Sequence, residues 1–355
     1  MNLFKRATNR IGMNKISIAL CTYNGAKFLE EQLASFSRQT RLPDELIVCD
    51  DRSSDATVEI IEEFGRVARF PVTIHVNKTN LGSTKNFEQA ISLCTGDLIF
   101  LADQDDVWFP NKLERFAAEF ERSEKIGMVF SDAALVDENL EPLGHNLWDI
   151  SFTAEERRKA QRGRMLEVLL RRNVVTGATM AFRASLRRVF SPIPSDIPNT
   201  IHDAWIALMI STNAEISFIE ENCMLYRQHA AQQLGIDWKY KEKIKERMKR
   251  LARRERYADG VGREEKEIAR LRKLADILKF HPQFQNEEAE ALLDGLSTSF
   301  IEESRQKARH YEARKNLPSN RLRRIPPIIK ELWTNRYRRF SKGFLSAGKD
   351  LLEKG

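Results

Sequence analysis

The sequence predicts an α/β fold with a mixed, mainly parallel sheet flanked by helices, followed by a basic helical C-terminal extension. Between residues 16 and 131, short apolar runs alternate with segments whose apolar residues recur every three or four positions. Short strands separated by such helices are typical of βαβ units. Polar and acidic residues directly follow three of the apolar runs, which predicts a ligand site where those strands end.

Five apolar runs are expected to form strands, and their Val, Ile and Leu content predicts a sheet that is buried on both faces. They are residues 16–21, 45–50, 71–76, 97–102 and 126–131. A first helix is expected where apolar residues recur at helical spacing at Phe28, Leu29, Leu33 and Phe36. A second helix is expected at residues 54–68, with Ser54 as its cap and with Val58, Ile61, Phe64 and Val67 on its apolar face.

The pattern is less regular after residue 132. We expect a strand at residues 174–182, a helix at 202–211, and two short strands at 216–219 and 224–227. From Trp238 onward the sequence predicts charged helices, broken near Pro282, Pro318 and Pro326-Pro327. The expected domains are an N-terminal leader at 1–13, an α/β domain at 14–235 and a helical basic region at 236–355.

Composition points to the cytoplasm. The 355 residues suggest about two domains. The four cysteines are scattered without a CxxC pair, which is typical of small buried side chains in a reducing compartment. Residues 1–15 are basic, but no apolar segment of a secretory signal follows them. The longest apolar run, residues 204–210, is far shorter than the roughly 20 residues that span a bilayer.

Positive charge is concentrated in the C-terminal part of the chain. The net charge is +7, but residues 241–355 contain 30 Lys and Arg against 18 Asp and Glu, a net of +12, which leaves −5 for residues 1–240. Residues 321–342 hold eight basic residues and one acid, interleaved with aliphatic and aromatic residues. This combination suits an anionic membrane surface. Nucleic acid and a solvated helical face are the competing interpretations.

Three carboxylates, Asp103, Asp105 and Asp106, follow the apolar run at residues 98–102. Like charges this close repel one another, and burial strengthens the repulsion, so a positive group is expected among them. A divalent cation fits, because Mg²⁺ takes oxygen ligands and usually shares its shell with substrate phosphates. The alternative is an acidic turn that caps the helix starting near Pro110.

Two further strand ends carry polar groups toward the same edge of the expected sheet. The first strand is followed by Thr22-Tyr23-Asn24-Gly25, and the second by Asp51-Arg52-Ser53-Ser54-Asp55. The ring of Tyr23 can pack on a nucleotide base, and the carboxylate of Asp51 can accept a hydrogen bond from a base N–H. The acidic loop can hold ribose and a metal-bound diphosphate. The three loops together predict a nucleotide site.

These motifs resemble, in their order, those of family 2 glycosyltransferases with the GT-A fold. The matching residues are Thr22-Tyr23-Asn24-Gly25, Val48-Cys49-Asp50-Asp51-Arg52-Ser53-Ser54-Asp55, Asn80-Leu81-Gly82, Leu101-Ala102-Asp103-Gln104-Asp105-Asp106-Val107-Trp108, Thr176-Gly177-Ala178, His202-Asp203-Ala204-Trp205 and Tyr226-Arg227-Gln228-His229. The resemblance covers about residues 14–230. It implies transfer of a sugar from a nucleotide donor with inversion at the anomeric carbon. The family often has Gly-Asn-Asn after this His, where this chain has Ala230-Ala231-Gln232-Gln233.

The resemblance implies a role for each matched position. Asp203 would be the general base that takes the proton of the acceptor hydroxyl; the alternative is a carboxylate stabilised at a helix N-terminus. The donor nucleotide would contact Thr22, Tyr23, Asn24, Asp51, Asn80, Gly82, Asp103 and Gln104. Mg²⁺ or Mn²⁺ would be held by Asp105, Asp103 and His229. The acceptor or diphosphate side would include Gly177, Trp205, Arg227 and Trp108, with the two tryptophans stacking on sugar faces or packing at the core edge.

The expected substrates are a UDP-, dTDP- or GDP-linked sugar and a glycan or lipid-linked glycan, in cell-surface polysaccharide synthesis at the inner face of the cytoplasmic membrane. A sugar nucleotidyltransferase is one alternative, although it would need a Gly-rich basic loop in place of Thr22-Tyr23-Asn24-Gly25-Ala26. A nucleic-acid-binding protein acting through the basic region is another, and no nucleic acid is expected. A catalytically inactive scaffold is poorly motivated, because every matched acidic position is occupied.

Overall fold

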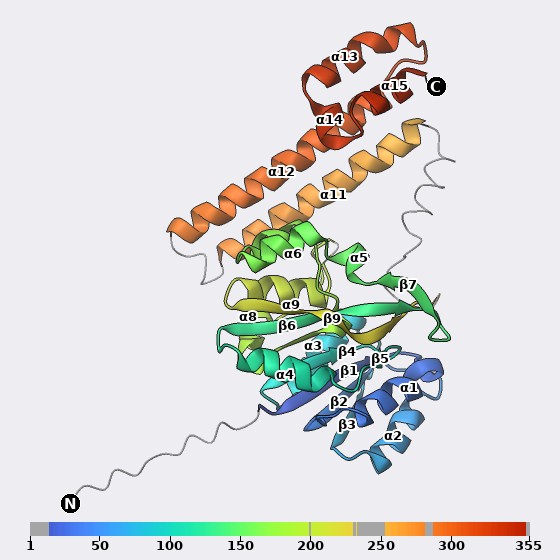
Figure 1. The fold of residues 1–355 in the computed structure, drawn as a ribbon, viewed down its shortest axis with the longest axis vertical. Helices are drawn as coiled ribbons and strands as arrows, with labels where there is room; N and C mark the ends of the chain where they lie inside the picture. The colour runs from blue at the N-terminus through green and yellow to red at the C-terminus, as the bar shows by residue number, and fades with distance from the viewer. Residues whose placement is uncertain (1–13, 199, 230–231, 233–252, 281–286, 353–355) are drawn as a thin grey trace, which may run out of the picture. The chain divides into compact units, whose positions relative to one another are not determined.

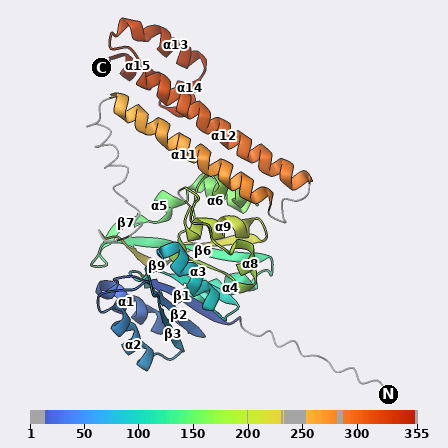
Figure 2. The same cartoon turned by 180° about the vertical axis from the view of Figure 1, so that it is seen from behind.

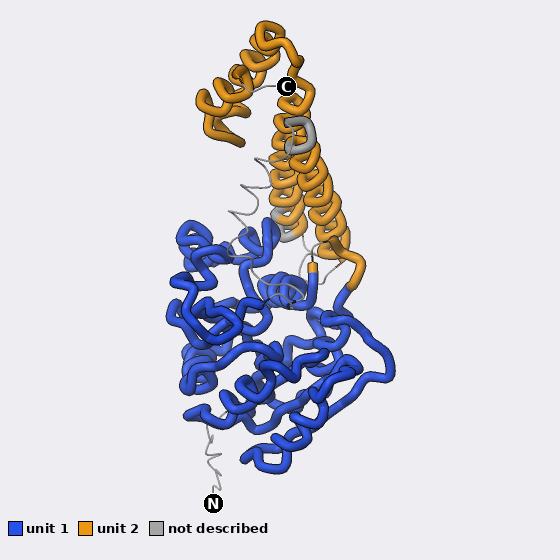
Figure 3. The backbone as a smooth tube through the Cα atoms, turned by 90° about the vertical axis from the view of Figure 1, so that its right-hand side faces the viewer, with its two compact units in different colours: residues 1–194, 201–232 blue, residues 195–200, 233–355 orange. Residues whose placement is uncertain are grey.

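The computed structural model describes residues 14–198, 200–229, 232, 253–280 and 287–352. The chain forms two compact units, one of residues 1–194 and 201–232 and the other of residues 195–200 and 233–355 (Figure 3). The expected leader, the departures at Ala230, Ala231 and Gln233, the helical segment from Trp238 to residue 252 and the break at Pro282 lie outside the described residues. The predicted domain boundary after residue 235 remains a prediction.

The first unit is built on a nine-stranded sheet, in the order β3-β2-β1-β4-β8-β6-β9-β5, with β7 paired to β6 (Figure 1). The strands are β1 Ile16–Thr22, β2 Glu45–Asp50, β3 Val72–Val76, β4 Leu98–Ala102, β5 Val107–Trp108, β6 Ile126–Val136, β7 Pro142–Asn146, β8 Met180–Arg183 and β9 Glu215–Arg227. Strands β3, β2, β1 and β4 are mutually parallel, whereas β8 runs antiparallel to both β4 and β6. The predicted mixed, mainly parallel α/β sheet is confirmed.

Helices cover both faces of this sheet, and every residue of β1 and β4 is buried. The helices are α1 Ala26–Ser37, α2 Thr57–Val67, α3 Ser83–Leu93, α4 Lys112–Glu121, α5 Trp148–Ser151, α6 Ala154–Gln161, α7 Met165–Arg171, α8 Arg187–Phe190 and α9 His202–Ser211. Helix α3 packs on β1 and β2, and α4 packs on β6. Figure 1 shows α4 on the near side of the sheet, and Figure 2, seen from behind, shows α3 on the near side. None of the described helices is both long and apolar enough to cross a lipid bilayer.

The expected strands at 16–21, 45–50, 71–76 and 97–102 are present to within one residue at each end. The strand expected at 174–182 is wrong in its first half, because Gly177–Thr179 forms a 3-10 turn closed by the Thr179 amide donating to the Thr176 carbonyl. The two short strands expected at 216–219 and 224–227 are one strand, β9. Its ladder with β6 shifts register between Ser131 and Ala134, which lets one long strand bend without ending.

The second predicted helix starts later than expected. Ser54 does not cap it, because the Ser54 amide donates to Asn24 Oδ1 and the helix begins at Thr57, whose amide donates to Asp55 Oδ1. Val67, expected on the apolar face, is exposed at the last turn. The side chain that stabilises the start of this helix is therefore Asp55.

The second unit is helical. Its elements are α11 Arg253–Lys279, α12 Glu287–Lys315, a 3-10 turn Leu322–Arg324, α13 Ile325–Trp333, α14 Arg336–Phe340 and α15 Phe344–Leu352. Helices α11 and α12 pack along each other, and a small core of Leu317, Ile328, Tyr337 and Ala347 joins the last helices. Pro326 and Pro327 do not break a helix as expected. They lie in the first turn of α13, where the fixed backbone angle and missing N–H of proline are tolerated.

A buried carboxylate holds these helices together. Asp350 is fully buried and receives two hydrogen bonds from the Arg314 guanidinium, at 2.6 and 3.0 Å. The hydroxyls of Tyr337 and Tyr257 donate to the same carboxylate, at 2.7 and 3.0 Å. Helices α11, α12, α14 and α15 therefore meet at one charge.

We expect Asp350→Asn to destabilise this unit strongly, because it leaves the buried Arg314 without its counter-ion, a change that typically costs about 3–5 kcal/mol. Amide hydrogen exchange across α12–α15 should accelerate accordingly, whereas Asp276→Asn on the exposed side of α11 should leave it unchanged. Equal protection in the two variants would contradict the assignment of Asp350 as the central contact.

Candidate active site

The ends of β1, β2 and β4 lie together at one edge of the sheet. The parallel registers pair Thr22 with Asp50 and Leu20 with Ala102, so the loops that follow these strands start side by side. The Thr22 hydroxyl donates to Asp50 Oδ2 at 2.7 Å, which ties the first two strand ends together. The edge predicted from sequence is therefore where the three polar loops meet.

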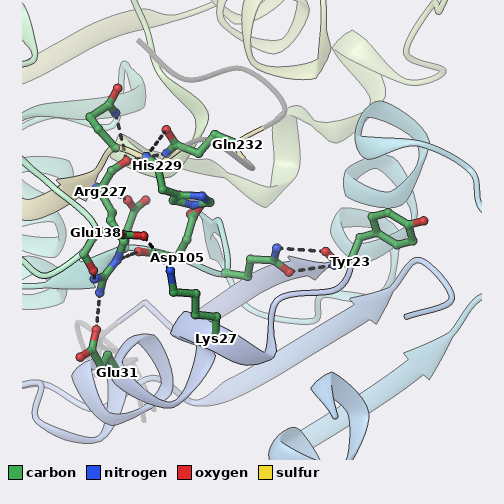
Figure 4. A network of polar contacts seen from close by, with 11 residues as sticks. Tyr23, Lys27, Glu31, Asp105, Glu138, Arg227, His229 and Gln232 are labelled. Atoms are coloured by element: carbon green, nitrogen blue, oxygen red, sulfur yellow. Dashed lines mark hydrogen bonds and ion pairs between the residues drawn. The ribbon is translucent and has the colours of Figure 1, made fainter. Parts of the chain in front are cut away.

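Gln104 ties the first loop to the acidic loop. Its Oε1 accepts from the Tyr23 amide at 2.8 Å, and its Nε2 donates to the Tyr23 carbonyl at 3.1 Å (Figure 4). A Cβ at Gly25 would lie 2.2 Å from the same Oε1, so only glycine fits beside this contact. The Tyr23 ring is half exposed and points away from the two hydrogen bonds that its backbone makes with Gln104. The polar atoms of Gln104 thus fix the backbone, and the ring of Tyr23 is presented to solvent.

Asp51 fixes the loop between β3 and α3. Its carboxylate accepts from the Leu81 amide at 2.7 Å, the Gly82 amide at 2.8 Å and Asn77 Nδ2 at 2.9 Å, and the Asn80 side chain donates to the Asp51 carbonyl at 3.3 Å. Gly82 has φ of +77°, a conformation that favours glycine. The predicted donor residues Asp51, Asn80 and Gly82 are thus brought together, and the contact of Asp51 with a base remains a prediction.

The acidic loop concentrates negative charge where there is little solvent. Burial raises the pKa of Asp103 to about 7, and the charges of Asp105 and Asp203 add to the effect. Burial, with the charges of Asp105 and Asp103, also raises the pKa of Asp106 well above its ordinary value. Asp106 Oδ1 accepts from the Arg227 amide, whereas its buried Oδ2 has no hydrogen-bond partner among the described residues. Asp106 therefore pairs with the end of β9 and does not cap α4.

Arg227 holds the backbone of the acidic loop in place. Its fully buried guanidinium donates to the Asp105 carbonyl at 2.7 Å, pairs with Glu31 on α1 and donates to the Glu138 carbonyl (Figure 4). Its carbon lies 4.6 Å from the centroid of the Phe28 ring. Each nitrogen of the guanidinium has a protein partner, and the contact of Arg227 with a diphosphate remains a prediction. The pairing with Glu31 had no signal in the sequence.

His229 and Asp105 form the pair that the metal prediction needs. The imidazole Nε2 lies 2.8 Å from Asp105 Oδ2, and both side chains are largely buried. Across the described residues, no group of three or more His, Cys, Asp or Glu side chains converges on one point. A carboxylate paired with an imidazole nevertheless fits a hard divalent cation whose remaining ligands come from a diphosphate and water.

Asp203 stands at the N-terminus of α9, as expected. Its Oδ2 accepts from the Gly177 amide at 3.1 Å and its Oδ1 from the Ala204 amide. Burial raises its pKa to about 6. The neighbouring His202 stacks on Phe87 with ring centroids 4.1 Å apart, and burial lowers the pKa of His202 to about 3, so it is neutral. Gly177, assigned to the acceptor side, therefore lies directly against the carboxylate assigned as base.

The two tryptophans are buried in the core, which is the packing alternative that the sequence left open beside stacking on sugars. Trp108 packs edge-on against Phe36 with ring centroids 4.8 Å apart. Trp205 donates its indole N–H to the Phe190 carbonyl at 2.8 Å. Both use an amphipathic ring to fill space at the core edge and leave no face for a ligand.

Sequence reasoning missed Lys112, a second buried basic side chain near the acidic loop besides Arg227. Its ammonium donates to the Ala178 carbonyl at 2.8 Å and lies 3.8 Å from the centroid of the Trp108 ring. Burial lowers the pKa of Lys112 to about 7, against the opposing pull of nearby acids that include Asp106 and Asp103. A single lysine in the first turn of a helix carries no pattern that would have identified it.

Comparison with known proteins agrees with this geometry. A family model described as glycosyl transferase family 2 matches residues 17–190. The matched segment, residues 17–190, belongs to glycosyl transferase family 2. The crystal structure of Staphylococcus aureus TarS 1–349 in complex with UDP-GlcNAc has a TM-score of 0.53 at 18% identity, over 84% of this chain and 91% of that one, which shows a shared fold.

Curated relatives of this chain differ in how much of their length is matched. The dTDP-rhamnosyl transferase RfbG of Shigella flexneri is 29% identical over 64% of this chain and 77% of its own length. The abequosyltransferase RfbV of Salmonella typhimurium is 36% identical over 26% of this chain and 28% of its own. The uncharacterized protein Rv1520 of Mycobacterium tuberculosis is 28% identical over 61% of this chain, and the match spans 59% of the relative's length.

We expect Asp105→Asn to weaken metal-dependent nucleotide binding by more than about tenfold, since even partners behind the metal ligands typically contribute 10–100-fold to metal affinity. Titration calorimetry with UDP, dTDP and GDP, each with Mg²⁺ or Mn²⁺, measures the change. Glu121→Gln, an isosteric change at an exposed carboxylate on α4, is the control. Nucleotide affinity that is the same in both variants would rule out Asp105 as a ligand.

Proposed function

We propose that this protein is an inverting glycosyltransferase that moves a sugar from a nucleoside-diphosphate donor to a hydroxyl of a glycan or lipid-linked glycan. The observation that carries the proposal is the pairing of a buried carboxylate at the start of α9, Asp203, with an acidic loop at the carboxyl edge of a parallel sheet. The charge of Asp203 contributes to the raised pKa of Asp103, so the two lie within electrostatic reach. That arrangement offers a proton acceptor beside a diphosphate site.

The nucleotide would lie on the loops after β1, β2 and β4. The half-exposed ring of Tyr23 supplies a stacking surface for a base, and Gln104 fixes the backbone beneath it. Asp51, Asn80 and Gly82 form the adjoining wall. A UDP-, dTDP- or GDP-linked sugar is compatible with this wall. The names of relatives support the same class of donor, since RfbG is a dTDP-rhamnosyl transferase and TarS was crystallised with UDP-GlcNAc.

Asp105 and His229, with Asp103 nearby, would hold Mg²⁺ or Mn²⁺. When bound, such an ion supplies charge neutralisation for the departing nucleoside diphosphate. The residues of the chain keep the two ligands in place. Arg227 holds the backbone of Asp105, and the Phe28 ring lies 4.5 Å from the imidazole of His229.

Asp203 would take the proton of the acceptor hydroxyl as that oxygen attacks the anomeric carbon. A single displacement of this kind inverts the configuration, and the base must be ionised beforehand. With a pKa of about 6, Asp203 is mostly ionised at pH 7 and is a better proton acceptor than an exposed aspartate. The Gly177 and Ala204 amides orient it, and neutral His202 adds no competing charge.

The acceptor that we propose belongs to cell-surface polysaccharide synthesis, either a glycan or a glycan on a lipid carrier. The names of the relatives RfbV, an abequosyltransferase, and EpsE of Bacillus subtilis, a putative glycosyltransferase 32% identical over 35% of this chain, support sugar transfer and name no acceptor. A lipid-linked acceptor would place the enzyme at the inner face of the cytoplasmic membrane. The donor class is tested by incubating the protein with Mg²⁺ or Mn²⁺ and each of a panel of nucleotide sugars, and by measuring the hydrolysis of each donor.

Asp203→Asn should retain donor binding and lose transfer. Asparagine has the same shape and can still accept the Gly177 hydrogen bond through its single oxygen, at the loss of the bond from the Ala204 amide, while the proton acceptor is removed. We expect kcat to fall by about 10²–10⁴-fold with little change in donor affinity. Asp149→Asn, at an exposed carboxylate on α5, should keep full turnover. A loss smaller than about tenfold would assign the base to another residue.

The pH dependence should report the same group. Protonated Asp203 cannot accept a proton, and its pKa is raised to about 6, so kcat/KM should fall tenfold per unit below about pH 6 and level off above it. Donor affinity measured across pH 5–8 separates this limb from titration in the acidic loop. A profile that stays flat down to pH 5 while donor binding is constant would exclude Asp203 as base.

A further inference from the structure

We propose that residues 321–352, the 3-10 turn with α13, α14 and α15, form a docking face for an anionic lipid bilayer. This segment lies wholly within the described residues and ends the second unit (Figure 1). Two independent features of its surface support the proposal, the sign of its exposed charge and the exposure of its large apolar side chains. The inference concerns a surface other than the proposed active site, and vesicle binding can be measured without any sugar donor.

The exposed charge of the segment is entirely positive. Seven basic side chains are exposed, and none of them makes an ion pair with a described residue: Arg321, Arg323, Lys330, Arg338, Arg339, Lys342 and Lys349. The segment contains only two acids, Glu331 and Asp350, and both are buried. Solvent therefore meets cations on this surface without an interspersed carboxylate.

Both acids are turned inward by specific partners. Glu331 lies 2.9 Å from His310 Nδ1 on α12 and accepts from Arg336 at 2.7 Å. Asp350 is bound by Arg314 and by two tyrosine hydroxyls. The remaining arginine, Arg324, is also buried and donates to the carbonyls of Pro318, Ser319 and Asp350. The fold thus separates the inner charges, which are paired, from the outer charges, which are not.

Large apolar side chains stand among these cations. Leu322, Ile325, Ile329 and Trp333 are spaced three, four and four residues apart, so they share one face of α13 and the turn before it. Trp333 is 88% exposed and Leu322 76%. On α15, Phe344 is 83% exposed and Leu345 78%. The same helices bury other residues, such as Ile328 and Ala347, in their own core, so these exposed groups are not needed for the fold.

A bilayer suits this surface better than the other partners. A helix with cations around Trp, Leu and Ile side chains inserts its apolar groups at the headgroup boundary while the cations meet anionic headgroups. Nucleic acid would use the cations but not the exposed aliphatic side chains. A second copy packed on the same face would bring seven cations against seven, because a two-fold interface pairs identical patches.

The test is flotation of the full-length protein with vesicles of phosphatidylglycerol and phosphatidylcholine, against vesicles of phosphatidylcholine only. We expect binding to the anionic vesicles to be at least tenfold stronger and to weaken as salt is raised. Trp333→Asp with Ile329→Asp should reduce it by more than tenfold. Arg338→Glu with Arg339→Glu should do the same, because each basic residue near such a surface is worth about fivefold.

Matched controls lie on α11 and at the residue that follows it. Phe280→Asp makes the same kind of change at a side chain that is 83% exposed, and Lys266→Glu with Arg272→Glu makes the same change in net charge. Both controls should float like the parent protein. Equal binding to the two kinds of vesicle, or equal losses in test and control variants, would overturn the proposal. So would loss of self-association in Trp333→Asp with vesicle binding unchanged, since that result assigns the face to a second copy.

Discussion

The arrangement of the proposed active site depends on the buried guanidinium of Arg227. This one group joins the end of β9 to the acidic loop through the Asp105 carbonyl, to α1 through Glu31 and to the segment after β6 through the Glu138 carbonyl. Hydrogen bonds that involve a charged group are stronger than neutral ones, and a buried charge that lost them would be very unfavourable. The position of Asp105 relative to His229 is therefore set by contacts behind both residues, which is what a site needs if it is to meet a ligand without rearranging.

The protein gathers several carboxylates at the site, where burial makes their negative charges unfavourable. Asp103, Asp106 and Asp203 all have raised pKa values because burial removes water without supplying enough positive charge. Lys112, a buried amine near this loop, has its own pKa lowered to about 7 by burial. A fold selected only for stability would not gather these groups, and departures of this kind are typical of functional sites. A cation and a nucleotide's hydrogen-bond donors would relieve the repulsion in the acidic loop. Asp203 gains the basicity that proton transfer requires from its burial.

The sequence predicted the parts of this fold that depend on local patterns. Apolar runs followed by polar loops located β1, β2 and β4 and the edge where they end. Neighbouring residues in the sequence determine both the burial of a strand and the point at which it ends. It failed where a long-range contact decides the outcome. The sequence left open whether Trp108 and Trp205 stack on a ligand or pack in the core, and their contacts with Phe36 and the Phe190 carbonyl decide this. The sequence did not reveal the pairing of Arg227 with Glu31, because the two residues lie 196 positions apart. No sequence pattern identifies Lys112, because its lowered pKa depends on burial and on nearby acids, such as Asp106 and Asp103, that are brought close only by the fold.

The C-terminal helices also contain acidic and basic residues, but here the acids are buried and the bases are exposed. In the first unit, carboxylates gather at an edge where a ligand can reach them, whereas in residues 321–352 both carboxylates are withdrawn from solvent. Burying Asp350 and Glu331 brings little stability by itself, because the desolvation of an ion pair offsets most of its attraction. Apolar residues of similar size would have filled the same space. What the ion pairs do change is the outer surface. They let Arg314 on α12 and Arg336 on α14 neutralise the only two acids of the segment, so that every charge left outside has one sign.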